Sequence, residues 1–136
     1  MTLHSKDYPE IKAIVDAYGR FLPVATYPWV TLSVAACAVF FAWFGGKYLF
    51  PTFTLYPRML SQWSISALEY SFLLPGIIGS VEILGYSPNS IAIIIHALQL
   101  AAYFLLNMVT TRIPLTWRHA IAFPLMIVAV LLVAFD

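Results

Sequence analysis

Four long apolar segments alternate with short polar connections along the chain. They cover residues 28–50, 60–81, 90–109 and 116–135, and each is close to the ~20 residues that a helix needs to cross a bilayer. A backbone in lipid must satisfy its own hydrogen bonds, and the runs lack the alternation of a membrane barrel. The pattern therefore predicts an all-α integral membrane protein whose four transmembrane helices form one domain, residues 28–136.

Residues 1–27 differ from the rest, because charged and apolar positions recur there with helical spacing. Asp7, followed by Pro9 and Glu10, is typical of a capped helix start. This segment is predicted to be an amphipathic helix on the membrane surface. No long apolar run precedes residue 28, so we expect no cleavable signal peptide and expect the first span to direct membrane entry.

The amino-acid composition supports the membrane assignment and argues against nucleic acid as a partner. The chain is 62% hydrophobic and only 10% charged, which excludes an ordinary soluble domain. A net charge of +1 offers no basic surface for nucleic acid, so we expect none as a partner. The single cysteine, Cys37, cannot form an internal disulfide.

The basic residues near the predicted helix ends give only a small orientation signal. One side would carry Lys6, Lys12 and Arg20, and the other Lys47, Arg58, Arg112 and Arg118. The residues nearest the membrane favour a cytoplasmic location for the two short loops on the second side.

Polar residues follow one face of the second and third predicted spans. With ~100° between successive residues, each set falls within a sector of roughly 80°. On the second span the set is Arg58, Gln62, Ser66, Glu69, Leu73, Gly76 and Ser80. On the third it is Ala92, His96, Gln99, Tyr103, Asn107 and Thr110. Since lipid disfavours such faces, they are expected to face each other, another subunit or a wet cavity.

Glu69 lies near the predicted midplane, where a bare carboxylate costs roughly 2.5–3.5 kcal/mol. We therefore expect it to be protonated or paired. One interpretation is a coupling carboxylate that exchanges a proton for a substrate, with His96, Gln99 and Tyr103 lining the same site. The alternative is a neutral glutamate hydrogen-bonded to one of these three residues as a packing device.

Other chemistry has little support in the sequence. His96 could relay protons with Glu69 or simply pack, but no second His or Cys stands at ligand spacing, so we expect no metal. His119 would lie on the order of 10 Å from His96 in depth, which excludes a haem axial pair. No catalytic or phosphate-binding motif is present, so we expect neither an enzyme nor a cofactor.

Small residues and a proline suggest how the helices pack. The face that includes Ala38, Ala42 and Gly45 allows a neighbouring backbone to come close. Pro75 and Gly76 are expected to kink the second span, because Pro75 cannot donate to the carbonyl of Ser71.

Three local patterns carry a resemblance to a known family: residues 41–45 (FAWFG), residues 68–72 (LEYSF) with Pro75 after them, and residues 114–120 (PLTWRHA). In their order and spacing they resemble small four-helix members of the drug/metabolite transporter superfamily. The nearest likeness is to a bacterial family of unknown function, remotely related to small multidrug resistance proteins. The resemblance covers about residues 30–135. It implies that Glu69 takes the position of the second-helix glutamate and that a dimer completes the transport path.

The sequence also departs from that family's usual pattern, which has three further intramembrane charged positions. The corresponding stretches here read GIIG at residues 76–79, IIH at 94–96 and Arg112 before residue 113. Two functions therefore remain open: a dimeric, proton-coupled transporter of a small metabolite or cation, and a non-catalytic accessory subunit of a respiratory or photosynthetic membrane complex. Either would reside in a bacterial or organelle inner membrane, with lipid and a second copy or other membrane subunits as partners.

Overall fold

The computed structural model describes residues 8–45, 49–112 and 114–134, which form helices and short connections. The α-helices are α1 (Pro9–Gly19), α2 (Tyr27–Phe40), α4 (Leu55–Ile78), α5 (Pro88–Thr111) and α6 (Trp117–Ala134). A 3-10 turn, η2 (Val24–Thr26), precedes α2, and two π-helical turns, η3 (Phe41–Gly45) and η4 (Gly79–Ile83), follow α2 and α4. The predicted helical class is confirmed.

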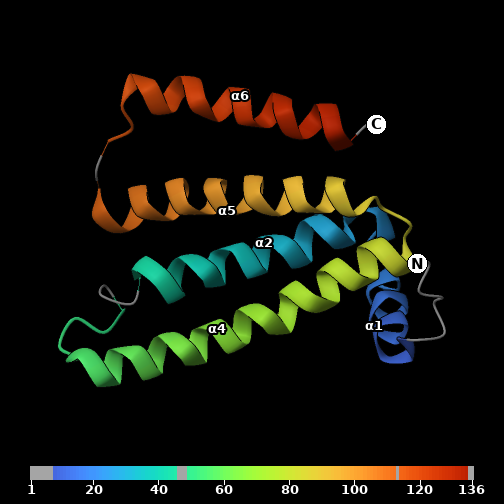
Figure 1. Ribbon diagram of the computed structural model, residues 1–136, viewed down its shortest axis with the longest axis horizontal. Coiled ribbons are helices and arrows are strands. Elements are labelled where there is room, and N and C mark those ends of the chain that lie inside the picture. The colour runs from blue at the N-terminus through green and yellow to red at the C-terminus, as the bar shows by residue number, and fades with distance from the viewer. Residues whose placement is uncertain (1–7, 46–48, 113, 135–136) are drawn as a thin grey trace.

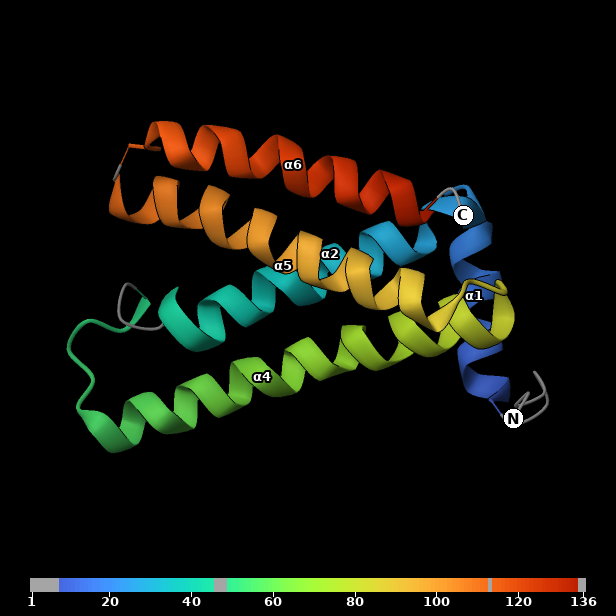
Figure 2. The ribbon, with the colours of Figure 1, turned by 45° about the horizontal axis from the view of Figure 1, so that its top comes forward.

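The four long helices lie lengthwise beside one another (Figures 1 and 2). α2 packs between α4 and α5, and α6 packs on the outer side of α5. α1 crosses one end of this bundle, where it contacts η2 and η4. Helices adjacent in sequence are therefore not always neighbours, because α2 keeps α4 and α5 apart along most of their length.

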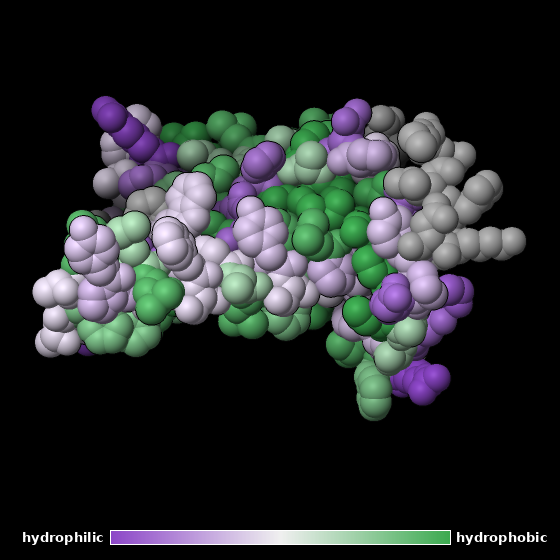
Figure 3. All heavy atoms as spheres, turned by 60° about the horizontal axis from the view of Figure 1, so that its bottom comes forward, coloured by the Kyte–Doolittle hydropathy of each residue, from purple (hydrophilic) through white to green (hydrophobic). Residues whose placement is uncertain are grey.

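Within the described residues, three helical segments are long and apolar enough to cross a membrane: Val24–Trp43, Leu55–Ile83 and Pro88–Thr110. The last helix, Trp117–Val133, is equally apolar in character but shorter. Figure 3 shows the darkest purple side chains mainly at the ends of the molecule, with a largely green to white surface between them. This banded distribution is typical of a protein embedded in lipid.

The second span begins and ends differently from the prediction. α4 starts at Leu55, earlier than residue 60, and Pro57 lies inside its first turn. A proline is tolerated there, because the first amide groups of a helix have no intrahelical acceptor. At the other end Glu82 does not open a loop but belongs to the π-helical turn η4.

The first span also changes form before its predicted end. α2 stops at Phe40 and continues as the π-helical turn η3. The predicted end at residue 50 follows residues 46–48, which lie outside the described part of the chain. The predicted cap residue Asp7 lies outside it too, and the structure has Tyr8 at the N-cap of α1.

α1 is tied to the end of the bundle by aromatic residues. The rings of Tyr18 and Tyr27 meet edge to face with centroids 5.2 Å apart, and the Tyr18 hydroxyl lies 2.6 Å from the Oγ1 of Thr26. Val15 is buried. The amphipathic helix therefore has its apolar side on protein, at the point where α2 begins.

Candidate functional site

The polar face of α4 turns toward α2. Glu69 and Gly76 are buried, as are Gly79 and Ser80 of η4, whereas Ser71 on the opposite side of α4 is exposed. Arg58, Gln62 and Ser66, which continue the polar face toward the start of α4, are partly buried. α2 therefore covers the face that carries the polar residues, and the apolar face of α4 is left for lipid.

Two glycines bring the backbones of α2 and α4 close together. A Cβ atom on Gly76 would lie 2.8 Å from the Oγ1 of Thr31, and one on Gly79 would lie 2.7 Å from the ring of Tyr27. The Tyr27 hydroxyl donates a hydrogen bond of 2.9 Å to the carbonyl of Pro75. These contacts fix the two helices in an antiparallel register.

Continuing this register places Glu69 at the level of Ala38. The adjoining face of α2 consists of small buried residues, including Ala35, Ala38 and Ala42. Glu69 itself is 7% exposed and makes no hydrogen bond or ion pair with any residue that the structure describes. Glu69 thus lies largely buried at the level of a stretch of small residues, without the hydrogen-bonding partner in the described chain that a packing glutamate would require.

A groove opens next to Glu69, one helical turn nearer the start of α4. It has a volume of about 480 Å³ and is lined by Ala42, Trp43, Gln62, Trp63 and Ser66. The amide and hydroxyl come from the polar face of α4, and the tryptophans flank them from η3 and α4. Trp43 and Trp63 were not predicted to belong to this site. Trp43 directly follows Ala42 of the small-residue face, and Trp63 directly follows Gln62 of the polar face.

The predicted site residues on α5 lie elsewhere. His96 is exposed on the outer surface of the bundle, and Gln99 and Tyr103 are partly buried. The ring of Tyr103 packs edge to face on Phe40 of α2, with centroids 5.7 Å apart. Because α2 lies between α4 and α5, one chain does not bring these three residues to Glu69.

Residues predicted to support packing have distinct positions. Ala38, Ala42 and Gly76 are buried where α2 and η3 contact α4, a region called the α2–α4 seam below. Pro75 provides the carbonyl that Tyr27 binds. The α-helix continues through Pro75 as far as Ile78, and the irregular geometry comes in η4. Gly45 closes the π-helical turn η3, and its burial lies outside what the structure describes.

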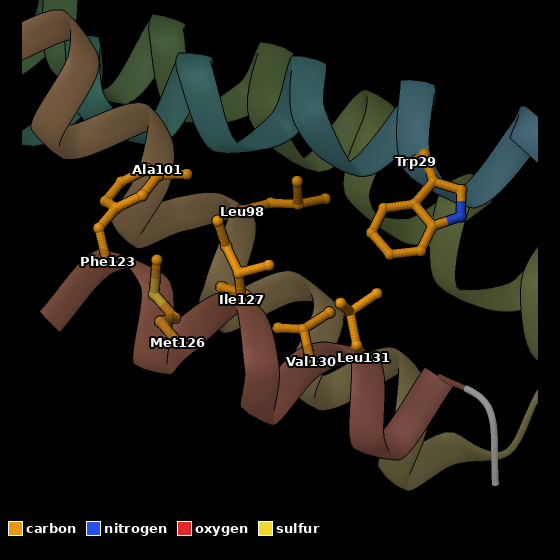
Figure 4. Close-up of a pocket in the computed structure, with 9 residues that line it drawn as sticks. Trp29, Leu98, Ala101, Phe123, Met126, Ile127, Val130 and Leu131 are labelled. Atoms are coloured by element: carbon orange, nitrogen blue, oxygen red, sulfur yellow. The ribbon is translucent and has the colours of Figure 1, made fainter. Parts of the chain in front are cut away.

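A second cavity, between α2, α5 and α6, offers no chemistry. It measures about 180 Å³, and Figure 4 shows Trp29 facing Leu98 and the α6 side chains Ile127 and Leu131. Every residue that lines it is apolar, apart from the indole nitrogen of Trp29. This cavity can hold hydrocarbon but has no group that would orient a polar substrate.

Hydroxyl groups in the helices are largely satisfied by the helices themselves. Ser71 donates to the carbonyl of Ala67, and Ser80 to that of Gly76. Across the described residues, no three His, Cys, Asp or Glu side chains come together in a way that could hold a metal ion. Glu69 and the groove beside it are thus the strongest candidate site on geometric grounds.

Comparison with known proteins adds a family. Residues 28–134, from the first turn of α2 to the end of α6, match the family described as "Putative member of DMT superfamily (DUF486)", where DMT denotes drug/metabolite transporters. No curated protein and no solved structure shows significant similarity to the chain. The match confirms the resemblance read from the sequence and indicates a transporter-like integral membrane protein. The chain therefore belongs to the DUF486 family, which is placed in the DMT superfamily.

Proposed function

We propose that this protein is a proton-coupled transporter of a small metabolite or cation and that Glu69 is its coupling carboxylate. The observation that carries the proposal is the position of Glu69, which is buried against α2 and unpaired within the described chain, one turn from a groove with polar groups. A carboxyl group so placed is stable when protonated and needs a partner when ionised. Exchange of the proton for a substrate supplies that partner.

The groove supports a binding role because it combines polar and aromatic groups at the membrane-buried seam. Gln62 offers an amide and Ser66 a hydroxyl, while Trp43 and Trp63 provide large flat faces. Transport sites commonly place a few polar groups among apolar ones, so that binding is selective but reversible. A substrate in this groove would lie one turn from the proton-carrying group.

We further propose four membrane spans, with α6 as the fourth and α1 on the membrane surface. α6 is apolar and lies alongside three helices that are long enough to cross a membrane, which supports its insertion beside them. α1 crosses the bundle end and exposes Glu10, Lys12 and Asp16, as a helix at the headgroup level should.

A dimer is the proposed working unit. His96 faces outward from the middle of α5, where lipid would be an unfavourable environment for an imidazole. Burial of that face against a second copy would remove the cost and add His96, with Gln99 and Tyr103 near it, to a path shared by two subunits.

The test is substrate-driven proton movement in proteoliposomes that contain a pH-sensitive dye. Amino acids, carboxylates, sugar phosphates and organic cations serve as the substrate panel. We expect at least one class to move protons with the wild type and none with Glu69→Gln, since the amide has the same shape but cannot release a proton. Glu82→Gln is the matched control, because it removes an acid from η4, away from the groove.

Two results would contradict the proposal. The first is proton movement that survives in Glu69→Gln, and the second is a folded wild type that moves protons with no class of compound. If the second result came with co-purification of other membrane subunits in mild detergent, an accessory role would replace transport.

A further inference from the structure

Arg58 occupies an unusual position at the start of α4. Its Nε atom is buried and has no hydrogen-bond partner, and it is the one such buried side-chain atom among the residues described. Buried donors in folded proteins are almost always paired, particularly when the group is charged. Arg58 as a whole is partly exposed, so its unpaired N–H can receive an acceptor that the described residues do not supply.

The position of Arg58 links it to the groove. Arg58, Gln62 and Ser66 are spaced by four residues and share one side of α4, and the last two of them line the groove. Arg58 lies about one turn, ~6 Å, beyond Gln62 in the direction away from Glu69. Glu69 is eleven residues from Arg58, about 16 Å along the helix. Arg58 thus lies one turn beyond the lined part of the groove on one side, and Glu69 lies about one turn beyond it on the other.

The charges around this end of the bundle have one sign. α4 begins where α5 ends and α6 begins, so Arg58, Arg112 and Arg118 share one end of the molecule (Figure 2). Apart from Glu69, each acidic residue that the structure describes, Glu10, Asp16 and Glu82, lies on α1 or η4 at the opposite end. These three arginines form a cationic rim, which raises the local concentration of anions. No acidic residue described at this end competes with a bound anion for Arg58.

We propose that Arg58 binds an anionic group of the transported substrate at the mouth of this groove, so that the substrate class is a small metabolite bearing a carboxylate or phosphate. This inference rests on the proposed transport function and narrows its substrate. A guanidinium matches such oxyanions because it presents parallel N–H donors in a planar fork. The rest of the substrate extends along Gln62 and Ser66 between the two tryptophans.

A lipid phosphate could supply the same chemistry, so the experiment separates the two sources. Wild-type protein in a neutral detergent, free of lipid, is titrated with inorganic phosphate and with succinate at constant ionic strength. Tryptophan fluorescence reports binding, because Trp43 and Trp63 line the groove. In a second arm, the same protein is placed in phosphatidylcholine vesicles with or without phosphatidylglycerol, and its fluorescence is compared.

The variants are Arg58→Gln, Arg58→Lys and the control Arg118→Gln, which removes an exposed charge at the same end. We expect at least one soluble anion to bind the wild type, with affinity lowered about 10- to 100-fold in Arg58→Gln and less in Arg58→Lys. Arg118→Gln should lose much less affinity than Arg58→Gln, because it removes one charge of the rim but no donor to the bound anion. Circular dichroism of each variant confirms that the helices are intact.

Three results would overturn the inference: wild-type affinity in Arg58→Gln, equal losses in Arg58→Gln and Arg118→Gln, or an Arg58-dependent response to phosphatidylglycerol alone. Binding is measured without any proton gradient, so its outcome is independent of the Glu69 assay. Proton movement that is driven only by organic cations would leave transport standing and refute the anionic substrate.

Discussion

The seam between α2 and α4 and the seam between α5 and α6 are built in different ways. The first has glycines at the contact, a buried acid and a hydrogen bond between helices. The second also has a hydrogen bond between helices, from the Ser90 hydroxyl to the Val133 carbonyl at 3.3 Å, but its described residues include no glycine at the contact and no buried acid. Its other features are Val130 as the buried α6 residue within the described chain, ring contacts of Phe104 with Phe123 and His119, and an apolar cavity nearby. In lipid, helices gain little from excluding solvent, so close contact and polar bonds decide which pairs are firm.

This difference separates the chemistry of the protein from its apolar packing. The close contact between α2 and α4 holds Glu69 at the level of Ala38. The contact between α5 and α6 leaves space that hydrocarbon can fill. Four changes test the comparison, and they are ordered by the size of the expected effect.

The largest effect is expected for Gly79→Ala. A Cβ atom at this position would lie 2.7 Å from the ring of Tyr27, which is 0% exposed and is held by its hydrogen bond to Pro75. Overpacking of this kind costs about 1–3 kcal/mol, which outweighs the ~1 kcal/mol that alanine gains as a helix former. Unfolding in mixed micelles with rising sodium dodecyl sulfate measures the change. Wild-type stability would show that the seam is not close-packed.

Tyr27→Phe should have the next largest effect. It removes the hydroxyl that donates to the Pro75 carbonyl and leaves the ring in place. We expect a loss of about 0.5–1.5 kcal/mol in the same unfolding assay. Tyr56→Phe is the control, because Tyr56 is 80% exposed. Equal effects of the two substitutions would mean that the hydrogen bond across the seam contributes nothing.

A smaller effect is expected at the start of α6. The backbone N–H of Thr116 donates to the Nδ1 of His119 over 3.2 Å, in the manner of a capping box. His119→Ala should cost about 0.5–1 kcal/mol, whereas His119→Asn retains an acceptor near the same position and should cost less. Helix content and unfolding of the two variants are compared. If asparagine is as harmful as alanine, contact of the imidazole with Phe104 matters more than the cap.

The smallest effect is expected for Ala101→Val. Ala101 lines the apolar cavity of about 180 Å³ between α2, α5 and α6, so two added methyl groups have space there. We expect stability within about 0.5 kcal/mol of the wild type, as volume added to an existing void is tolerated. A loss as large as that of Gly79→Ala would erase the distinction between the two seams.

The helices and the burial of the α4 polar face could be predicted from the sequence, but not the helix that covers that face. Periodicity identifies a side that avoids lipid, and Gln62, Ser66 and Glu69 all lie on that side. It does not specify the neighbour, which depends on the close fit of Gly76 against Thr31. One possibility was that the polar faces of α4 and α5 contact each other. The structure instead places α2 between the two helices.

Helix ends and single exposed residues were also beyond prediction. The predicted start of the second span at residue 60 left Pro57 outside it, yet Pro57 lies in the first turn of α4, where a proline is tolerated. His96 shares a sector with Gln99 and Tyr103, but the sector is wide enough for one edge to face outward. Arg58 looked like an ordinary residue at a membrane edge until the structure showed its buried, unpaired nitrogen.

The glycine contacts between α2 and α4 also have a consequence for biogenesis. These helices are consecutive long elements, so their hairpin can form before α5 packs against it. Once formed, that hairpin presents Leu32, which lies beside Gly76 of α4 and forms a buried cluster with Ile91 and Ile94 of α5. A defect at Gly76 or Gly79 would therefore reach every later step of assembly, whereas one in α6 would affect only the last.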